Sequence, residues 1–350
     1  MMKITKFFFK PNLLSNIMNR ENNNYDFLRL LAAVTVIIGH SYAIVGKEGW
    51  MDPIQKLIHF NFSGGVAVIV FFFFSGLFVT TSIQKNPSLL RFAMHRCFRI
   101  FPALIVALLI TAYVIGSLFT TLSIKQYLSN PETISYVYRN TLLHSIQWRL
   151  PGVFEKSSYG INGSIWSLPL ELHLYVLIFL LAALQLLKNR WAAVSSLVAV
   201  MVFSLMNKNI FCYFTQDGSA QYVFAFFLIG AICSYFRQWI VINLGGVLLF
   251  SLLLLLAWNT SFKIGIFYLW LNYLLLFIFQ LKQLQKINLG GDYSYGVYIY
   301  GFPVQQVMNS LLPGHTPLLN LILSIPCALL LGVASWHWIE KPTIRLVSNI

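Results

Sequence analysis

The sequence is dominated by uncharged, apolar stretches of about 20 residues, which recur from one end of the chain to the other. A helix of that length spans a bilayer, and in lipid only helices and closed barrels satisfy every backbone polar group. Only 10% of the 350 residues are charged, whereas a soluble domain carries about a quarter. We therefore expect an all-α polytopic membrane protein.

The apolar stretches predict about ten transmembrane helices, separated by short polar or turn-forming breaks. The remaining residues predict a basic N-terminal arm at 1–24, ahead of one transmembrane domain at 25–345 with a long loop at 120–164. The predicted spans are residues 25–45, 63–84, 99–119, 165–187, 191–207, 219–236, 240–258, 264–281, 292–312 and 317–339.

The distribution of basic residues predicts the orientation of the chain. With the N-terminus placed in the cytoplasm, 15 of the 24 Lys and Arg residues lie on that side and 8 on the other, four of them in loop 120–164. Because short cytoplasmic loops carry the excess of Lys and Arg, both termini are expected to be cytoplasmic and loop 120–164 extracytoplasmic.

The net charge of +14 does not indicate a nucleic-acid-binding protein, because the basic residues are spread over short loops without a recognition module. The four cysteines have neither paired nor metal-like spacing. We therefore expect no nucleic-acid partner, no disulfide framework and no metal site.

The first predicted span carries three ionisable residues, Asp26, Arg29 and His40. Asp26 and Arg29 are three residues apart, and Arg29 and His40 are eleven apart, which is close to three whole helical turns. The three side chains therefore share one face, with His40 about 16 Å along the axis from Arg29. Intramembrane ionisable residues are functional candidates by default. The alternative is that Asp26 and Arg29 anchor the helix at the interface and His40 is a hydrogen-bonded packing residue.

A carboxylate in the fourth span is the second candidate. Glu171, within "SIWSLPLELHLYV", lies about six residues in from the outer surface, and His40 about five residues before the outer end of its span. Their similar depth predicts contact, with the carboxylate orienting or charging the imidazole ring. Alternatively, Glu171 pairs with Trp166, Tyr175 or a water.

Two arginines open the third span in "RFAMHRCFRIFPAL". Arg96 and Arg99 are neighbours on one helix face, and their guanidinium groups suit a phosphate clamp at the cytoplasmic surface. The alternative is positive-inside anchoring. In "FFFFSGLF", the small pair Ser75 and Gly76 is typical of a close approach between helices.

Five motifs follow one another over about residues 22–345: "DFLRLLAAVTVIIGH", "FFFFSGLFV", "RCFRIFP", "WSLPLELHLY" and "WIEKP". In type and order they resemble the membrane acyltransferase-3 family, whose members include O-acetyltransferases of bacterial surface polysaccharides. Two positions depart from the family pattern: Gly301 and Phe302 precede Pro303 where many relatives have a His, and Leu172 stands where a second Glu often occurs. We expect the stand-alone form, without a fused hydrolase-like domain.

The resemblance implies an inner-membrane acyltransferase that moves an acyl group, commonly acetyl from acetyl-CoA, to a hydroxyl of an extracytoplasmic or lipid-linked glycan. Its partners are then acyl-CoA, the glycan and membrane lipid. His40 is expected to be the general base, or a transient acyl carrier, with Glu171, Asp26 and Arg29 completing the catalytic set. Donor binding is assigned to Arg96, Arg99 and Ser75, and acceptor binding to Trp166, Tyr175 and Tyr298.

A transporter or flippase of a lipid-linked glycan is the alternative from another functional class. Intramembrane Asp, Arg, His and Glu suit ion-coupled transport. The sequence has no twofold repeat, which many secondary transporters have, and this favours the enzyme.

Overall fold

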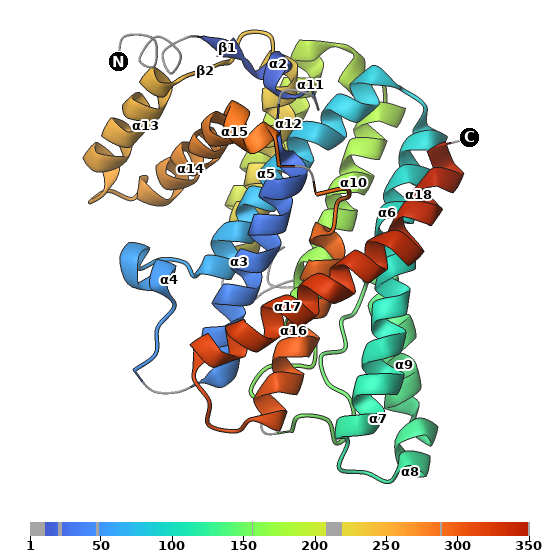
Figure 1. Cartoon of the computed structure of the whole chain (residues 1–350). Helices are drawn as coiled ribbons and strands as arrows, with labels where there is room; N and C mark the ends of the chain where they lie inside the picture. Colours follow the sequence, from blue (N-terminus) through green and yellow to red (C-terminus); the bar gives the residue numbers. More distant parts are fainter. Residues whose placement is uncertain are drawn as a thin grey trace.

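The structure, a computed structural model, describes residues 11–19, 23–46, 49–155, 157–207, 219–287 and 289–348. These residues are mostly helical (Figure 1), which confirms the all-α prediction. The long helices are α3 (Tyr25–Val45), α5 (Ser63–Lys85), α6 (Leu89–Leu109), α10 (Ser167–Ala183), α11 (Arg190–Met206), α12 (Ser219–Phe236), α13 (Leu244–Ala257), α14 (Lys263–Phe279), α16 (Ser294–Leu311) and α17 (Pro317–Ser335).

Shorter elements connect or extend these helices. They are β1 (Asn12–Leu13), α2 (Leu14–Ile17), α4 (Pro53–Ile58), η2 (Ile110–Ile115), α7 (Gly116–Phe119), α8 (Ile124–Ser129), α9 (Pro131–Leu142), η3 (Gly163–Trp166), η4 (Leu186–Lys188), β2 (Val241–Ile242), α15 (Lys282–Gln285), η6 (Trp336–Glu340) and α18 (Lys341–Ser348).

A helix occupies each of the ten predicted spans. Five helical runs are long and apolar enough to cross a membrane, and α11, α12, α13 and α14 are shorter apolar helices. The chain is therefore a multi-pass helical membrane protein, while the number of spans stays a prediction. The five long runs are Tyr25–Val45, Ser63–Lys85, Leu89–Phe119, Gly163–Ala183 and Pro317–Val347.

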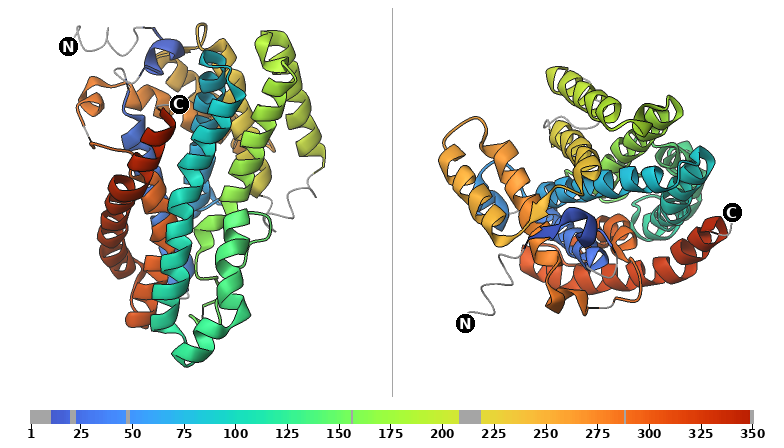
Figure 2. Two further views of the ribbon diagram at one scale, coloured as in Figure 1. Left: turned by 90° about the vertical axis from the view of Figure 1, so that its right-hand side faces the viewer. Right: turned by 90° about the horizontal axis from the view of Figure 1, so that it is seen from above.

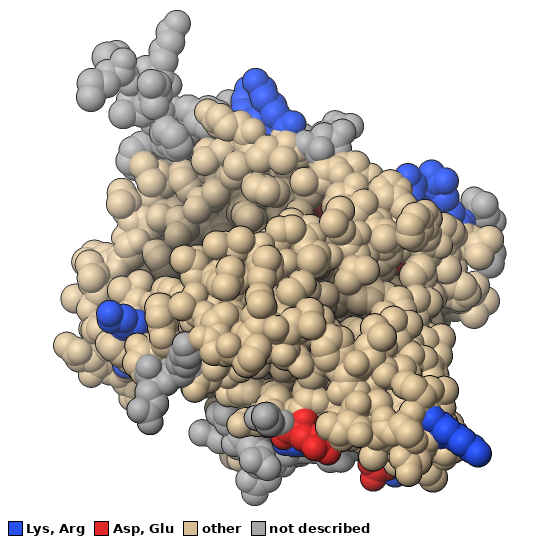
Figure 3. Space-filling model, turned by 60° about the horizontal axis from the view of Figure 1, so that its bottom comes forward, with Lys and Arg blue, Asp and Glu red and all other residues tan. Residues whose placement is uncertain are grey.

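The first and last helices, α2 and α18, lie at the same end of the bundle, which we call the N/C end (Figure 1). We call the opposite end, where α7 and α8 lie, the loop end. With the loop end turned forward, most of the surface is uncharged and the few charged side chains lie near its edge (Figure 3). Uncharged walls of this kind suit contact with lipid.

Part of the predicted N-terminal arm packs against the bundle. Strand β1 pairs antiparallel with β2, and Leu14 and Ile17 of α2 are fully buried. Residues 1–10 and 20–22 of the arm lie outside the described residues. The described part of the arm therefore belongs to the hydrophobic core.

The polar helix α16 is the centre of the bundle. All of its residues from Ser294 to Gln306 are buried, and it packs against α3 and α17. Buried amides need partners. Gln305 Nε2 donates to the carbonyl oxygen of Ile37 at 2.8 Å, and Gln306 Nε2 donates to Ser157 Oγ at 2.9 Å. The amide donors of both glutamines are thus satisfied by protein, which helps this helix to lie among apolar ones.

Helices α5 and α12 cross at backbone contact. A Cβ atom on Gly76 would lie 1.9 Å from the carbonyl oxygen of Phe227, and one on Gly230 would lie 2.0 Å from that of Phe73. Only glycine permits this crossing, because any side chain would collide with backbone rather than with a flexible group. The expected role of the Ser75–Gly76 pair in close helix packing is confirmed for Gly76.

The predicted loop 120–164 contains ordered helices. α6 continues through the π-helical segment η2 into α7, and the chain then returns as α8 and α9, which packs beside α6. The Tyr127 hydroxyl of α8 donates to the carbonyl oxygen of Ala112 in η2 at 2.6 Å, and Gly116 leaves room for it. The π-turn frees carbonyl groups from the helix ladder, and Tyr127 takes one of them.

The C-terminal helices form one long, tilted unit across the face of α3 and α16 (Figures 1 and 2). α17 continues through the π-helical segment η6 into α18, which packs against α6. This unit brings the "WIEKP" motif to the beginning of α6, near the N/C end.

Candidate functional site

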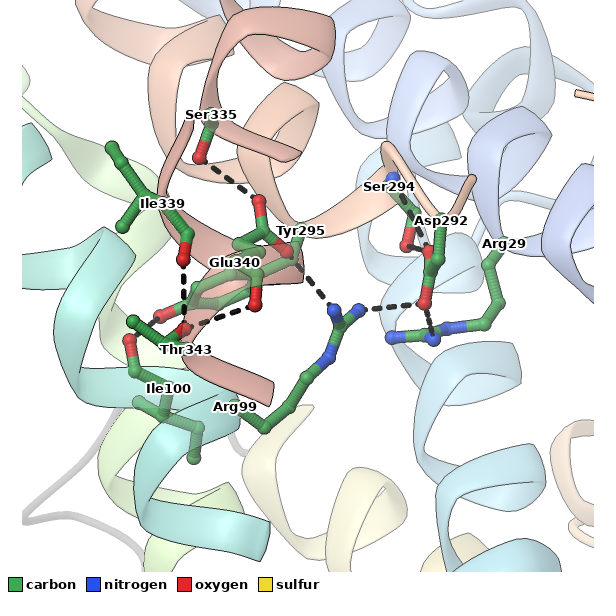
Figure 4. Close-up of polar contacts among 10 residues, drawn as sticks. All are labelled: Arg29, Arg99, Ile100, Asp292, Ser294, Tyr295, Ser335, Ile339, Glu340 and Thr343. Atoms are coloured by element: carbon green, nitrogen blue, oxygen red, sulfur yellow. Dashed lines mark hydrogen bonds and ion pairs between the residues drawn. The ribbon is translucent and has the colours of Figure 1, made fainter. Parts of the chain in front are cut away.

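Four buried or half-buried charged residues meet at the N/C half of the bundle (Figure 4). Asp292 Oδ2 accepts from Arg29 and, at 2.7 Å, from Nη2 of Arg99. The other nitrogen of that guanidinium, Nη1, donates to Glu340 Oε2 at 3.0 Å. We call this set the ion-pair cluster: Arg29, Arg99, Asp292 and Glu340.

Local structure holds both carboxylates of the ion-pair cluster in place. Asp292 lies two residues before α16 and accepts from Ser294 Oγ at 2.5 Å and from the Ser294 amide at 3.4 Å. Glu340 is only 1% exposed, at the end of the π-turn η6, and accepts from Ser335 Oγ at 2.9 Å. Each carboxylate therefore uses one oxygen for its own helix and the other for arginine.

The ion-pair cluster changes the interpretation of Arg29 and Arg99. The carboxylate that pairs with Arg29 is Asp292, and the side chain of Asp26 is exposed. Arg99 is held by two carboxylates and lies 5.7 Å from the Tyr295 ring, so its donors are already engaged. The predicted phosphate clamp of Arg96 with Arg99 is therefore not assembled in the structure.

Arg96 lies in a different environment from Arg99. Its guanidinium is 5.5 Å from the ring of Tyr175 and 5.9 Å from that of Phe92. The Tyr175 hydroxyl donates to Glu171 Oε1 and lies 3.4 Å from Ser75 Oγ. α5, α6 and α10 thus bring Ser75, Arg96, Tyr175 and Glu171 into one group, which we call the Tyr175 group.

His40 lies on α3 toward the loop end, between two aromatic rings. The ring centroids of Phe302 and Phe62 are 4.9 and 5.8 Å from that of His40. The side chain is half-buried, and neither ring nitrogen makes a hydrogen bond within the described residues. The predicted alternative, a hydrogen-bonded packing histidine, does not describe this environment.

The expected contact between His40 and Glu171 is not formed. Ser167 Oγ lies 2.7 Å from Tyr298 Oη, which fixes the register of α10 against the antiparallel α16. Phe302 is one turn beyond Tyr298 toward the loop end, and Glu171 is one turn beyond Ser167 toward the N/C end. His40, beside Phe302, and Glu171 are therefore separated by roughly 12 Å along the bundle. The equal depth predicted from span boundaries was wrong, and Glu171 pairs with Tyr175, the alternative partner.

The three residues predicted to bind the acceptor lie near the contact between Ser167 and Tyr298 or beyond it along α10. Tyr298 is buried, bonds Ser167 and lies edge-on to Phe71 with centroids 6.1 Å apart. Trp166 is half-buried against the hydrophobic core. Tyr175 belongs to the Tyr175 group. Tyr298 lies between the levels of His40 and Glu171.

The two positions that depart from the family pattern have structural explanations. A Cβ atom on Gly301 would lie 2.7 Å from Cγ1 of Ile37, so glycine lets α16 approach α3. Phe302 supplies the ring that meets His40. Leu172 packs against the core. None of these positions holds a titratable group near His40.

The sequence indicated the carboxylates of the ion-pair cluster without indicating their partners. Asp292 and Glu340 stand at the edges of the ninth and tenth apolar stretches, where a helix cap or an interfacial role is the default expectation. Their pairing with Arg29 and Arg99 depends on how four distant helices pack. Among the described residues, no group of His, Cys, Asp and Glu could hold a metal ion.

Comparison with known proteins gives a match over most of the chain. The acyltransferase-3 family, described as "Acyltransferase domain", matches residues 22–337. The chain is 32% identical to an O-acetyl transferase of Shigella phage Sf6, over 92% of this chain and 96% of that protein. It is 26% identical to nodulation protein 10 of Rhizobium leguminosarum bv. viciae, over 94% and 95%. No solved structure matches.

Proposed function

This chain belongs to the acyltransferase-3 family and is a membrane acyltransferase, and we propose that it transfers an acetyl group from acetyl-CoA to a glycan hydroxyl. The glycan is extracytoplasmic or lipid-linked, and the enzyme lies in the inner membrane with both chain ends in the cytoplasm. The similarity to an O-acetyl transferase over nearly the whole of both chains supports the acetyl group and the oxygen acceptor.

The observation that carries this proposal is the environment of His40. An imidazole whose two nitrogens make no hydrogen bond within the described residues, half-buried between the rings of Phe62 and Phe302, is placed to accept a proton from a bound hydroxyl. The surrounding aromatic rings offer apolar faces to a sugar ring. We assign His40 the role of general base.

The reaction follows from that role. His40 accepts the proton of the acceptor hydroxyl while the hydroxyl oxygen attacks the thioester carbonyl carbon. The carbon–sulfur bond then breaks, and the departing CoA thiolate takes up the proton that His40 received. The net products are an ester on the glycan and a free thiol. No acyl-enzyme is needed, because the oxygen nucleophile attacks the donor directly.

The positions of the other groups support delivery of the two substrates from opposite ends. Arg96 and the rest of the Tyr175 group lie toward the N/C end, where the donor's phosphates would enter from the cytoplasm. His40 lies toward the loop end, from which a glycan would approach. The ion-pair cluster joins α3, α6, α16 and η6 and fixes the wall of the path between them.

Two measurements test the function. Mass spectrometry of surface glycans, from cells with and without the gene, is expected to find an acetyl mass lost from one glycan. Purified protein given acetyl-CoA and that glycan is expected to release free thiol. A flippase would release none, and unchanged glycan masses together with no thiol release would refute the proposal.

A further inference from the structure

Two adjoining pockets lie at the N/C end, where α5 ends and α6 begins. One has a volume of about 180 Å³ and is lined by Ser82, Asn86, Arg91, Phe92, His95 and Arg96. The other has a volume of about 150 Å³, shares Asn86 and Arg91, and reaches the first turn of α6 and Val347 of α18. Together they form a polar recess that we call the α5–α6 pocket.

Among the described residues, the α5–α6 pocket is lined by three basic side chains and no acidic one. Arg91 lies about one turn of α6 before the adjacent residues His95 and Arg96, and His95 is within electrostatic reach of both arginines. The three ion pairs formed among the described residues all use Arg29 or Arg99. The positive charge of this recess is therefore not neutralised by the part of the chain that the structure describes.

These arginines have hydrogen-bond donors that an anion would satisfy. The Nε atoms of Arg91 and Arg96 are both buried, and neither has a hydrogen-bond partner among the described residues. A buried donor on a charged group is costly when unsatisfied, so an anion that accepts from both would be bound favourably. The N-terminus of α6, with Leu90 and Arg91 lining the recess, adds a partial positive charge.

We propose that the α5–α6 pocket binds phosphate, and that its occupant is the phosphorylated nucleotide end of the acyl-CoA donor. Guanidinium groups match the tetrahedral oxygens of phosphate with paired donors, and Asn86 and Ser82 supply neutral donors beside them. The assignment of the occupant rests on the proposed function. It moves the donor's phosphates from Arg99 to Arg91 and His95, which the sequence motifs did not indicate.

The register of the helices gives the distance that the donor must cover. Arg96 is four residues before Ile100, whose carbonyl oxygen accepts from the Tyr295 hydroxyl at 2.9 Å. Phe302, beside His40, is seven residues beyond Tyr295 along the parallel α16. The pocket and His40 are thus roughly 16 Å apart along the bundle. A donor with phosphates at one end of a long flexible arm and a thioester at the other fits this separation.

Arg96 links the pocket to the interior. Its guanidinium lines the recess and also lies over the ring of Tyr175, which bonds Glu171. An anion in the pocket would hold Arg96 on that ring. The Tyr175 group therefore lies on the route from the phosphates to His40.

The test measures binding, not activity, with full-length protein in phosphatidylcholine nanodiscs. Calorimetric titrations use CoA and pantetheine, which lacks the nucleotide and its phosphates. Arg91→Gln is expected to weaken CoA binding about tenfold and to leave pantetheine binding unchanged. His95→Gln is expected to change CoA binding in the same direction. Lys282→Gln, an exposed basic residue at the same end on α15, is the control and is expected to change neither.

The possible results distinguish a failure of the pocket proposal from a failure of the proposed function. If the wild type binds CoA and Arg91→Gln binds it equally well, only the proposal for the α5–α6 pocket is overturned. An equal loss of affinity for CoA and for pantetheine in Arg91→Gln has the same consequence. Wild-type protein that binds no CoA overturns the donor and, with it, the proposed function. A second titration adds phosphatidylglycerol to the nanodiscs. The donor assignment is wrong if two results occur together. In pure phosphatidylcholine, Arg91→Gln leaves CoA binding unchanged; with phosphatidylglycerol present, the lipid lowers CoA binding to the wild type but not to Arg91→Gln. The occupant of the pocket would then be a lipid headgroup.

Discussion

Arg29 and Arg99 share a single carboxylate oxygen, Oδ2 of Asp292. The two arginines come from α3 and α6, and the carboxylate lies two residues before α16, so one atom joins these three parts of the bundle. Glu340 balances the second positive charge. A buried cluster of this kind adds little net stability when complete, but the loss of one member leaves an uncompensated charge.

Neutralising the shared carboxylate is therefore expected to destabilise the protein strongly. Asp292→Asn should destabilise the protein by about 3–5 kcal/mol, because both arginines lose their common anion. Thermal unfolding in detergent measures this. Glu132→Gln, at an exposed site on α9, is the matched control and should unfold close to the wild type. Equal unfolding temperatures for Asp292→Asn and wild type would contradict the cluster.

The two arginines of "RCFRIFP" are expected to separate into different phenotypes. Arg99→Gln breaks two ion pairs and should lower stability, whereas Arg96→Gln removes a guanidinium that has ring contacts but no ion pair within the described residues. Arg96→Gln should therefore weaken acyl-CoA binding about tenfold with little loss of stability. Parallel titrations and melting curves check this, and a reversed pattern would show that Arg99 contacts the donor.

His40→Ala is expected to reduce acetyl transfer by about 10²–10⁴-fold, the usual contribution of a positioned general base. Thermal stability and CoA binding should remain near wild-type values, because the His40 ring makes no hydrogen bond in the described structure. His173→Ala, an exposed histidine on α10, is the control and should retain transfer. Transfer at wild-type rate by His40→Ala would remove His40 from the mechanism.

The crossing of α5 and α12 predicts a contrast between two glycines. Gly76→Ala forces a methyl group to within 1.9 Å of a backbone oxygen. This substitution should lower the stability of the protein by about 1–3 kcal/mol, the usual cost of overpacking. Gly265→Ala on α14 meets no atom within 4 Å and should be neutral or slightly stabilising, since alanine is the better helix former. Comparing the unfolding temperatures of the two variants tests the crossing. Equal effects would contradict it.

The proposed orientation can be tested by thiol labelling. In a chain whose own cysteines are replaced by serine, Ser129→Cys on α8 should react with a membrane-impermeant maleimide in intact spheroplasts. Lys282→Cys on α15 should react only after the membrane is opened. Both sites are exposed, so access depends on the side of the membrane alone. The opposite labelling pattern would invert the orientation.

Much of the architecture could be predicted from residue order alone. Apolar length located all ten helices because burial in lipid or core is the main requirement on each segment. The shared face of Arg29 and His40 followed from helical geometry, and both residues do contact the α16 segment, at Asp292 and Phe302. The helices inside loop 120–164 were not predicted, because they are short and amphipathic rather than apolar.

The pairings of charged groups could not be predicted. Depth was estimated by counting residues from span ends, and an error of a few residues at each end shifts His40 and Glu171 by two turns relative to one another. The partners of Arg99 are about 190 and 240 residues distant in the chain, so no local spacing relates them. The buried arginine nitrogens of the α5–α6 pocket depend on packing that no motif records.

The π-turn η6 sets how the faces of α17 and α18 are aligned. It joins α17 to α18 and holds about one residue more in its turn than an α-helix would. A regular α-helix through the same residues would turn α18 by about 100° relative to α17. The two helices would keep their composition and lose their shared alignment. The alignment of α18 with α17 therefore depends on the backbone geometry of this segment as well as on the identity of Glu340.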